Sequence, residues 1–170
     1  LLKLCVVLLA GFCIVSPALA MHASQQLAIV VNANDPQSKR IADYYQLKRG
    51  IPDENVIRVN LPADKKSIGR NKFEQIYQQV INSTPPHIQY YALAWSRPFK
   101  VGCMSITSAF AFGFDDAYCA KGCNSTRQSP YFNAATRKPY HDFGIRPTMM
   151  LAGSSVEQVR DMIDRGVESD

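Results

Sequence analysis

The stretch "LAIVVN", residues 27–32, is almost wholly apolar. A short run of this kind is typical of a strand buried on both faces of a sheet. A helix signal follows at once, because Asp35 can cap a helix and Pro36 suits its first position. Gly50 then supplies a residue that tolerates the left-handed conformation at a helix end. This order predicts a strand followed by a helix that crosses back over the sheet.

The same alternation continues along the chain. Further strand-like runs lie at 55–61, 88–95 and 147–153. Between the second and third runs, an apolar stripe at helical spacing is formed by Phe73, Ile76, Tyr77, Val80 and Ile81. A last helix is expected to begin with Ser154 and Glu157 as a capping box and to end at Gly166.

Strands that alternate with helices predict an α/β fold with a mostly parallel sheet, helices on both faces and right-handed crossovers. We therefore expect a three-layer sandwich of the flavodoxin or caspase type. An α+β arrangement with antiparallel pairing is the alternative. About fifty irregular residues separate the third and fourth strand-like runs, and we interpret them as a long insertion that contains cysteines.

The insertion includes "MSITSAFAFGFDDAYCAKGC", residues 104–123, in which Ser105 can cap a short helix. Three cysteines lie in the insertion: Cys103, Cys119 and Cys123. A disulfide is the default expectation for an exported protein, but three is an odd number and the pairing stays open. The loose spacing of Cys119 and Cys123 argues against a metal site completed by His141. We predict no metal and no cofactor.

The first twenty residues have the pattern of a secretory signal peptide. Lys3 precedes an apolar run, and the segment ends with Ala18-Leu19-Ala20. We therefore expect export through the Sec route, cleavage after Ala20, and a single α/β domain over 21–170 in the periplasm or outside the cell. Because the chain starts with Leu and stops after a helix, we also expect further sequence, above all beyond the C-terminus.

The composition limits the partners. The net charge of +5 is not gathered into a stripe, so nucleic acid is not an expected partner. No apolar run after residue 20 is long enough to span a membrane. The expected partner is therefore a small molecule or a peptide.

Polar residues follow several of the predicted strands. In open parallel sheets, ligands bind beyond the carboxyl ends of the strands. We therefore expect a rim at this edge that binds an anionic or peptide ligand, with help from backbone N–H groups at the last helix start. The motifs G-x-G-x-x-G, Walker A and G-x-S-x-G are absent. The candidate ligand residues are Asn32, Asn34, Asp35, Arg97, Lys100 and Ser154.

A hydrolase is the alternative function. Cys103 or Ser105 offers a nucleophile, and His141 offers a general base. Asp142 or Asp115 supplies a carboxylate to orient the histidine. The residue types of a catalytic triad are thus present in and around the insertion.

Three stretches carry a resemblance to known proteins: "VVNANDPQSKRIADYYQLKRGIPDENVIRVNLP" (30–62), "YYALAWSRPFKVGCMSITSAFAFGFD" (90–115) and "MMLAGSSVEQVRDMIDRGVESD" (149–170). They are similar to a family of exported bacterial proteins of unassigned activity, over nearly all of residues 27–170. Members of that family are longer than this chain. The resemblance implies no reaction, cofactor or catalytic residue.

A more distant resemblance is to the caspase-like fold of secreted cysteine peptidases such as the gingipains, which share the rhythm of strands, helices and a Gly-Ile-Pro turn. In that fold the catalytic His follows the third strand and the Cys follows the fourth. Here these places hold Trp95-Ser96-Arg97 and Ala152-Gly153-Ser154. The resemblance therefore implies the fold and not the peptidase activity.

Overall fold

The structure is a computed structural model that describes residues 23–120 and 122–169. The predicted signal peptide, residues 1–20, lies outside the described residues. Four strands form the main sheet in the order β2-β1-β4-β7, and every pair is parallel. These strands are β1 (Leu27–Asn32), β2 (Val56–Val59), β4 (Tyr90–Leu93) and β7 (Thr148–Met150).

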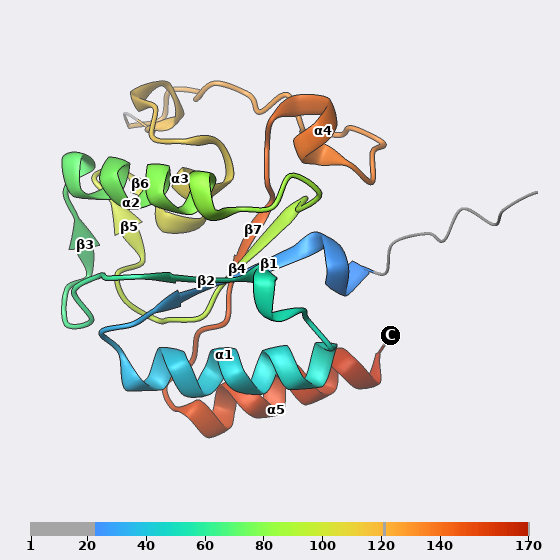
Figure 1. Cartoon of the computed structure of the whole chain (residues 1–170). Coiled ribbons are helices and arrows are strands. Elements are labelled where there is room, and N and C mark those ends of the chain that lie inside the picture. The colour runs from blue at the N-terminus through green and yellow to red at the C-terminus, as the bar shows by residue number, and fades with distance from the viewer. Residues whose placement is uncertain (1–22, 121, 170) are drawn as a thin grey trace, which may run out of the picture.

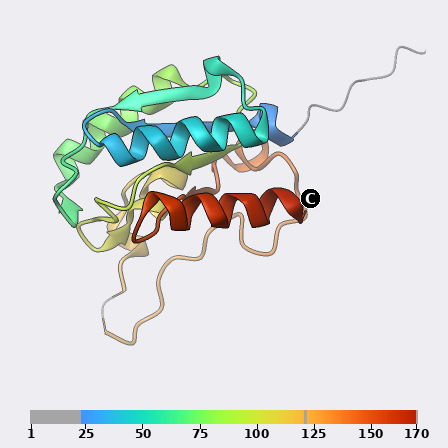
Figure 2. The same cartoon turned by 90° about the horizontal axis from the view of Figure 1, so that it is seen from below.

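Two pairs of helices cover the two faces of this sheet (Figure 1). On one face lie α1 (Pro36–Arg49) and α5 (Val156–Glu168), which pack side by side (Figure 2). On the other face lie α2 (Arg70–Ser83) and α3 (Ile106–Phe112). The predicted α/β fold with a parallel sheet between two helical layers is therefore confirmed.

Strand β1 is buried on both faces, as its apolar run predicts. Ala28 and Val30 belong to the core under α2 and α3. Ile29 and Val31 belong to the core under α1 and α5. Because successive side chains of a strand point to opposite faces, one uninterrupted apolar run supplies both cores.

The ends of α1 follow the predicted signals. The Asp35 carboxylate accepts a hydrogen bond from the Gln37 backbone N–H at 2.9 Å. Gly50 ends the helix with φ of 59°, and its N–H donates to the Gln46 carbonyl. Such a left-handed cap strains most residues other than glycine.

Both predicted ends of α5 are wrong. The cap is Ser155, one residue later than predicted, and its hydroxyl accepts from the Gln158 N–H at 3.2 Å. Gln158 thus takes the place expected for Glu157 in the capping box. The helix also continues through Gly166 to Glu168.

The insertion is more regular than the sequence indicates. Residues of the insertion and of the β2–α2 connection form a second sheet in the order β3-β5-β6. Its strands are β3 (Ser67–Ile68), β5 (Lys100–Val101) and β6 (Met104–Ser105). Ser105 caps α3 as predicted, and the short α4 (Pro139–Phe143) is unexpected. The remaining elements are the 3-10 helices η1 (Ala23–Gln26), η2 (Asp53–Asn55) and η3 (Asp116–Tyr118).

A disulfide joins Cys103, in the turn between β5 and β6, to Cys119 at the end of η3. The expectation of a disulfide is thus confirmed, with the pairing that the sequence left open now assigned. Cys123 is exposed and stands outside this pair. None of the described helices is long and apolar enough to cross a membrane.

Candidate functional site

Successive strands of the main sheet are added on opposite sides of β1. From β1 the chain passes through α1 to β2 on one side, and from β2 it passes through α2 to β4 on the other side. The loops that leave the carboxyl ends of β1 and β4 therefore diverge. In doubly wound sheets, ligands bind in the crevice that such a divergence opens.

A cleft of about 330 Å³ lies at this edge of the sheet. Its walls come from the loops that follow β1, β2, β4 and β7, and we call it the carboxyl-edge cleft. This volume lies at the small end of the range for ligand pockets, which is about 300–1,000 Å³. The lining residues are Asp35, Gln37, Ala63, Ser96, Arg97, Gly153 and Ser154.

Asn32, a predicted ligand residue, is fully buried at the end of β1, where its side chain makes structural hydrogen bonds. Its side-chain oxygen accepts from the backbone N–H groups of Leu61 at 3.0 Å and Asn34 at 3.2 Å. The Asn34 amide in turn donates to the Leu61 carbonyl at 3.3 Å. Both asparagines tie the end of β1 to the loop after β2, and neither lines the cleft. They shape one wall rather than offer contacts to a ligand.

Asp35 brings a carboxylate to the cleft. One carboxylate oxygen caps α1 through the Gln37 N–H. A carboxylate has two oxygens and several acceptor positions, so this bond does not exhaust its capacity. Asp35 can therefore accept a hydrogen bond from a ligand hydroxyl while it caps the helix.

Hydrogen bonds hold the loop after β4, which carries Arg97. Buried Trp95 donates from its indole nitrogen to the Pro98 carbonyl at 3.0 Å, and the Arg97–Pro98 peptide bond is cis. The Ser96 hydroxyl donates to the Gly153 carbonyl at 3.1 Å and accepts from the Gly153 N–H at 3.3 Å. These bonds join the loops after β4 and β7.

Arg97 is the cation of the carboxyl-edge cleft. Its side chain is exposed, and the ion pairs between described residues do not include it. A guanidinium offers a planar fork of N–H donors that fits a carboxylate or a phosphate. The cleft therefore presents a positive group at one wall and the Asp35 carboxylate at another.

The start of α5 caps itself, contrary to the expectation of backbone N–H groups open to an anion. Ser154 donates to the Gln158 side-chain oxygen from its N–H at 2.9 Å and from its hydroxyl at 3.0 Å. The pKa of Glu157 is lowered by a bond from its own backbone N–H and then by the Ser155 hydroxyl. A Cβ on Gly153 would come within 2.9 Å of a Val159 methyl group and 3.1 Å of the Gln158 side-chain oxygen, so a larger residue here would force the buried Val159 side chain to shift.

Lys100, the last predicted ligand residue, does not line the cleft. It is exposed on β5, in register with Ser67 of β3 and Ser105 of β6. The structure thus brings Asp35, Arg97 and Ser154 together and leaves Lys100 on the second sheet. Gln37 and Ala63 line the cleft without having been predicted.

The candidate catalytic residues are dispersed. Cys103 is bonded to Cys119 and so has no thiol in this structure. The Ser105 hydroxyl accepts from the Ser108 N–H at 3.0 Å and bonds to the Thr107 hydroxyl. None of the described hydrogen bonds joins Cys103 or Ser105 to His141.

His141 lies near the opposite edge of the sheet. Its backbone N–H and that of Tyr140 donate to the side-chain oxygen of Gln89, directly before β4. Its Nδ1 lies 2.8 Å from Asp142, which also accepts from Thr136. The pKa of Asp142 is lowered first by His141 and then by Thr136. The predicted histidine–carboxylate pair exists, but it is exposed, and neither Cys103 nor Ser105 is among its described hydrogen-bond partners.

One group of described residues has the spacing of a metal site: Cys103, Asp116 and Cys119, whose ligand atoms lie within 4.8 Å of one another. The two sulfurs are bonded to each other. A disulfide lacks the thiolates that hold zinc, so this group does not fit a metal in the oxidised protein.

No family model, curated protein or solved structure matches the chain. The resemblances to a family of exported bacterial proteins and, more distantly, to caspase-like domains stay predictions. The function must therefore be inferred from the geometry of the site itself.

Proposed function

We propose that this chain is the ligand-binding domain of an exported protein, and that the carboxyl-edge cleft holds a small polar molecule with an anionic group. One observation carries the proposal. Four loops converge on a cleft beside the switch point, and Arg97 enters it without an ion-pair partner among the described residues. An arginine so placed supports recognition of an anion.

The other groups in the cleft restrict the ligand further. Asp35 favours a ligand that donates hydrogen bonds, such as one with hydroxyl groups, and it disfavours a bare dianion. Ser96 and Ser154 engage their hydroxyls in local bonds, so they shape the cleft more than they select the ligand. A sugar acid or a sugar phosphate has the required combination of one anionic group and several hydroxyls.

Export is part of the proposal. The N-terminal pattern of residues 1–20 supports it, and a disulfide is typical of proteins that mature in an oxidising compartment. The hydrolase alternative has less support, because Cys103 is in the disulfide and Ser105 caps α3.

Calorimetric titration with glucose 6-phosphate, glucuronate and inorganic phosphate tests the proposal. We expect millimolar binding or tighter for a sugar acid or a sugar phosphate. Arg97→Gln should weaken it by about tenfold to a hundredfold, because a hydrogen bond to a charged group contributes about 1.5–3 kcal/mol.

Lys100→Gln is the matched control, since it removes a nearby exposed cation that does not line the cleft. We expect this variant to bind like the unaltered protein. Absence of binding by all three probes, or equal losses in the two variants, would contradict the proposal.

A further inference from the structure

The group of Cys103, Asp116 and Cys119 offers three ligands to a metal ion once its disulfide is open. The ligand atoms of the three residues lie within 4.8 Å of one another. In a tetrahedral zinc site with Zn–S bonds of about 2.3 Å, neighbouring ligand atoms are about 3.8 Å apart. The group is therefore close to the spacing of such a site, except that its two sulfurs are bonded to each other.

Local structure holds Asp116 and Cys119 on one side of a single helical turn. Asp116 begins η3 and Cys119 follows its last residue, and the Cys119 N–H donates to the Asp116 carbonyl at 3.0 Å. Side chains three residues apart lie one above the other in a 3-10 helix. The Asp115 carboxylate caps the turn by accepting from the Ala117 N–H at 2.9 Å. Because these bonds do not involve the disulfide, the turn presents the carboxylate and the sulfur side by side in either redox state.

The third ligand, Cys103, comes from the tip of a hairpin. Gly102 and Cys103 form the two-residue turn between β5 and β6, and the φ of Gly102 is 53°. A glycine with positive φ at the first position of such a turn is typical of a type II′ hairpin. The second sheet extends this hairpin, since β5 also pairs with β3. Backbone pairing therefore holds Cys103 in place without help from the disulfide.

The surroundings leave the Asp116 carboxylate accessible to a cation. Its Oδ2 lies 3.4 Å from the Arg70 guanidinium, and both side chains are mostly exposed. An ion pair of this kind contributes little to stability, so a metal ion can take the place of Arg70. Arg70 also lies over the Phe114 ring and keeps that contact when it loses the carboxylate.

We propose that the reduced group binds one Zn²⁺ through two thiolates and the Asp116 carboxylate, with water in the fourth position. Two thiol groups of a reductant supply two electrons and two protons to the S–S bond and leave as a disulfide. Zn²⁺ then displaces one proton from each cysteine thiol, because the thiolate is the metal ligand. The disulfide and the metal therefore exclude each other. This inference goes beyond the proposed function of the carboxyl-edge cleft and does not rest on it.

Titration of the reduced protein with Zn²⁺ supplies the test. The protein is reduced with dithiothreitol, freed of it in the absence of air, and titrated in competition with a chromophoric chelator. At about pH 7 we expect one Zn²⁺ to bind with micromolar affinity or tighter and to release about two protons. The oxidised protein should bind Zn²⁺ about a hundredfold more weakly or worse. Equal affinities of the two forms, or no binding by the reduced form, would overturn the proposal.

Two pairs of variants, all measured in the reduced state, identify the ligands. Cys119→Ser should weaken Zn²⁺ binding about a hundredfold or more, whereas Cys123→Ser removes the exposed thiol outside the group and should leave it unchanged. Asp116→Asn should weaken binding about tenfold or more, and Asp64→Asn should not. Asp64 is the matched control, because it too is an exposed carboxylate that lies 3.4 Å from a surface cation, Lys65. Equal effects within either pair would overturn the proposal.

Protection from alkylation is a second readout, which needs no variant to fold. Iodoacetamide is added to the reduced protein with and without Zn²⁺, and the modified cysteines are located by peptide mass. Zn²⁺ should slow the alkylation of Cys103 and Cys119 about tenfold or more and leave that of Cys123 unchanged, because a thiolate bound to a metal is a weaker nucleophile. Equal protection of all three cysteines, or protection of none, would also overturn the proposal.

Discussion

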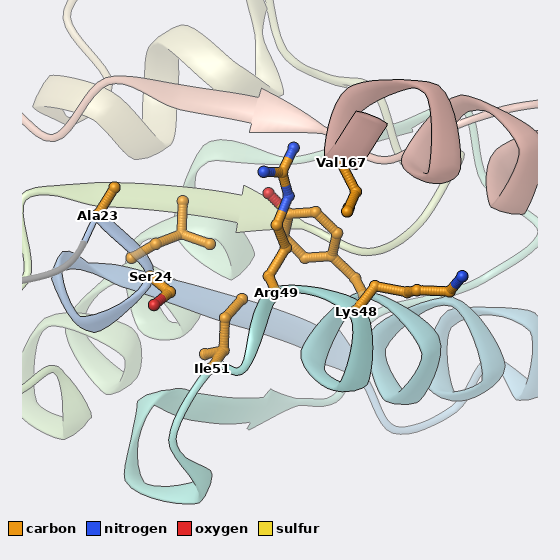
Figure 3. A pocket seen from close by; sticks show the side chains of 8 residues that line it. Ala23, Ser24, Lys48, Arg49, Ile51 and Val167 are labelled. Atoms are coloured by element: carbon orange, nitrogen blue, oxygen red, sulfur yellow. The ribbon is translucent and has the colours of Figure 1, made fainter. Parts of the chain in front are cut away.

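The two edges of the main sheet differ in the field that their helices create. The amino edge holds a pocket of about 500 Å³ between the start of β1 and the ends of α1 and α5, which we call the amino-edge pocket (Figure 3). Both α1 and α5 run from the carboxyl edge to the amino edge, so their N-termini lie near Arg97 and their C-termini near Arg49. Helix N-termini carry partial positive charge and C-termini partial negative charge. An anion in the carboxyl-edge cleft is thus favoured by the helices, and one in the amino-edge pocket is opposed by them.

The comparison shows that an arginine lies in different surroundings at each of the two edges. Arg97 adds its positive charge to the partial positive charge of the helix N-termini, which already favours anions. The side chain of Arg97 is exposed. Arg49 stands beside an apolar wall near the C-termini of α1 and α5. We therefore expect an anion to bind at the carboxyl edge rather than at the amino edge.

The largest expected effect is a loss of stability when the disulfide of the insertion is opened, while the carboxyl-edge cleft stays intact. Cys119→Ser opens the disulfide to Cys103, which closes a loop with a sequence separation of 16. The change should lower the free energy of unfolding by about 3 kcal/mol, mainly because the unfolded chain becomes less constrained. Urea denaturation followed by circular dichroism measures this loss.

Cys123→Ser is the control, since Cys123 is exposed outside the disulfide, and its stability should not change. Binding at the carboxyl edge should survive Cys119→Ser, because the disulfide does not line the cleft. Loss of glucose 6-phosphate binding in this variant would show that the insertion takes part in the site.

The next effect is the selectivity of the two arginine variants, only one of which should weaken the binding of the anion. Arg97→Gln should weaken glucose 6-phosphate binding about tenfold or more, and Arg49→Gln should leave it unchanged, because Arg49 lies at the other edge. Calorimetry with glucose 6-phosphate on both variants gives the two values required. If both variants weakened binding equally, the contrast between the two edges would be wrong.

Gly166→Ala sharpens the account of the amino-edge pocket. An alanine favours the helix by about 1 kcal/mol, but its Cβ would lie 3.1 Å from the guanidinium of Arg49, which would have to shift slightly. We expect urea denaturation to show a gain in unfolding free energy that stays below about 1 kcal/mol. The full helical gain would mean that the position of Arg49 does not matter.

The smallest effect concerns the contact between α1 and α5. The pKa of Asp164 is lowered from its ordinary value of 3.8, first by Lys48 and then by Tyr44. A carboxyl whose pKa is lower in the folded protein stabilises it above the unfolded pKa and loses this contribution as the pH falls through the folded value.

Thermal unfolding measured from pH 5 downward should therefore show a decline below about pH 4 to which Asp164 contributes. Asp164→Asn should make that decline shallower, while Asp161→Asn on the exposed side of α5 should not. Identical pH profiles for Asp164→Asn and the unaltered protein would show that this contact adds no stability.

Local patterns in the sequence were sufficient for the main sheet and its helices. The apolar run of β1 and the cap residues Asp35 and Gly50 act over a few neighbouring residues, and each of these predictions is confirmed. Two adjacent serines and two adjacent residues able to complete a capping box made the start of α5 ambiguous, and the choice of Ser154 was wrong by one position.

Other features depend on contacts far apart in the chain and left no local signal. Gly166 was predicted to end a helix, but its neighbour is Arg49, which lies on another helix. The strands of the second sheet have two residues each, too few to show a period. Strand ends alone were sufficient to predict that Asp35 and Arg97 lie at the carboxyl edge, where both line the cleft. The amino-edge pocket could not be predicted in this way, because it forms only when α1 and α5 pack together.

An NMR titration of the isotope-labelled protein with glucuronate and glucose 6-phosphate tests the central claim most directly. At ligand concentrations up to about 10 mM, we expect the largest shifts of backbone amide signals in the loops at 33–37, 62–64, 95–98 and 152–155. We expect those shifts to disappear in Arg97→Gln and to persist in Lys100→Gln. Shifts scattered over exposed lysines, or shifts in these loops that survive Arg97→Gln, would contradict the assignment of the carboxyl-edge cleft as the anion site.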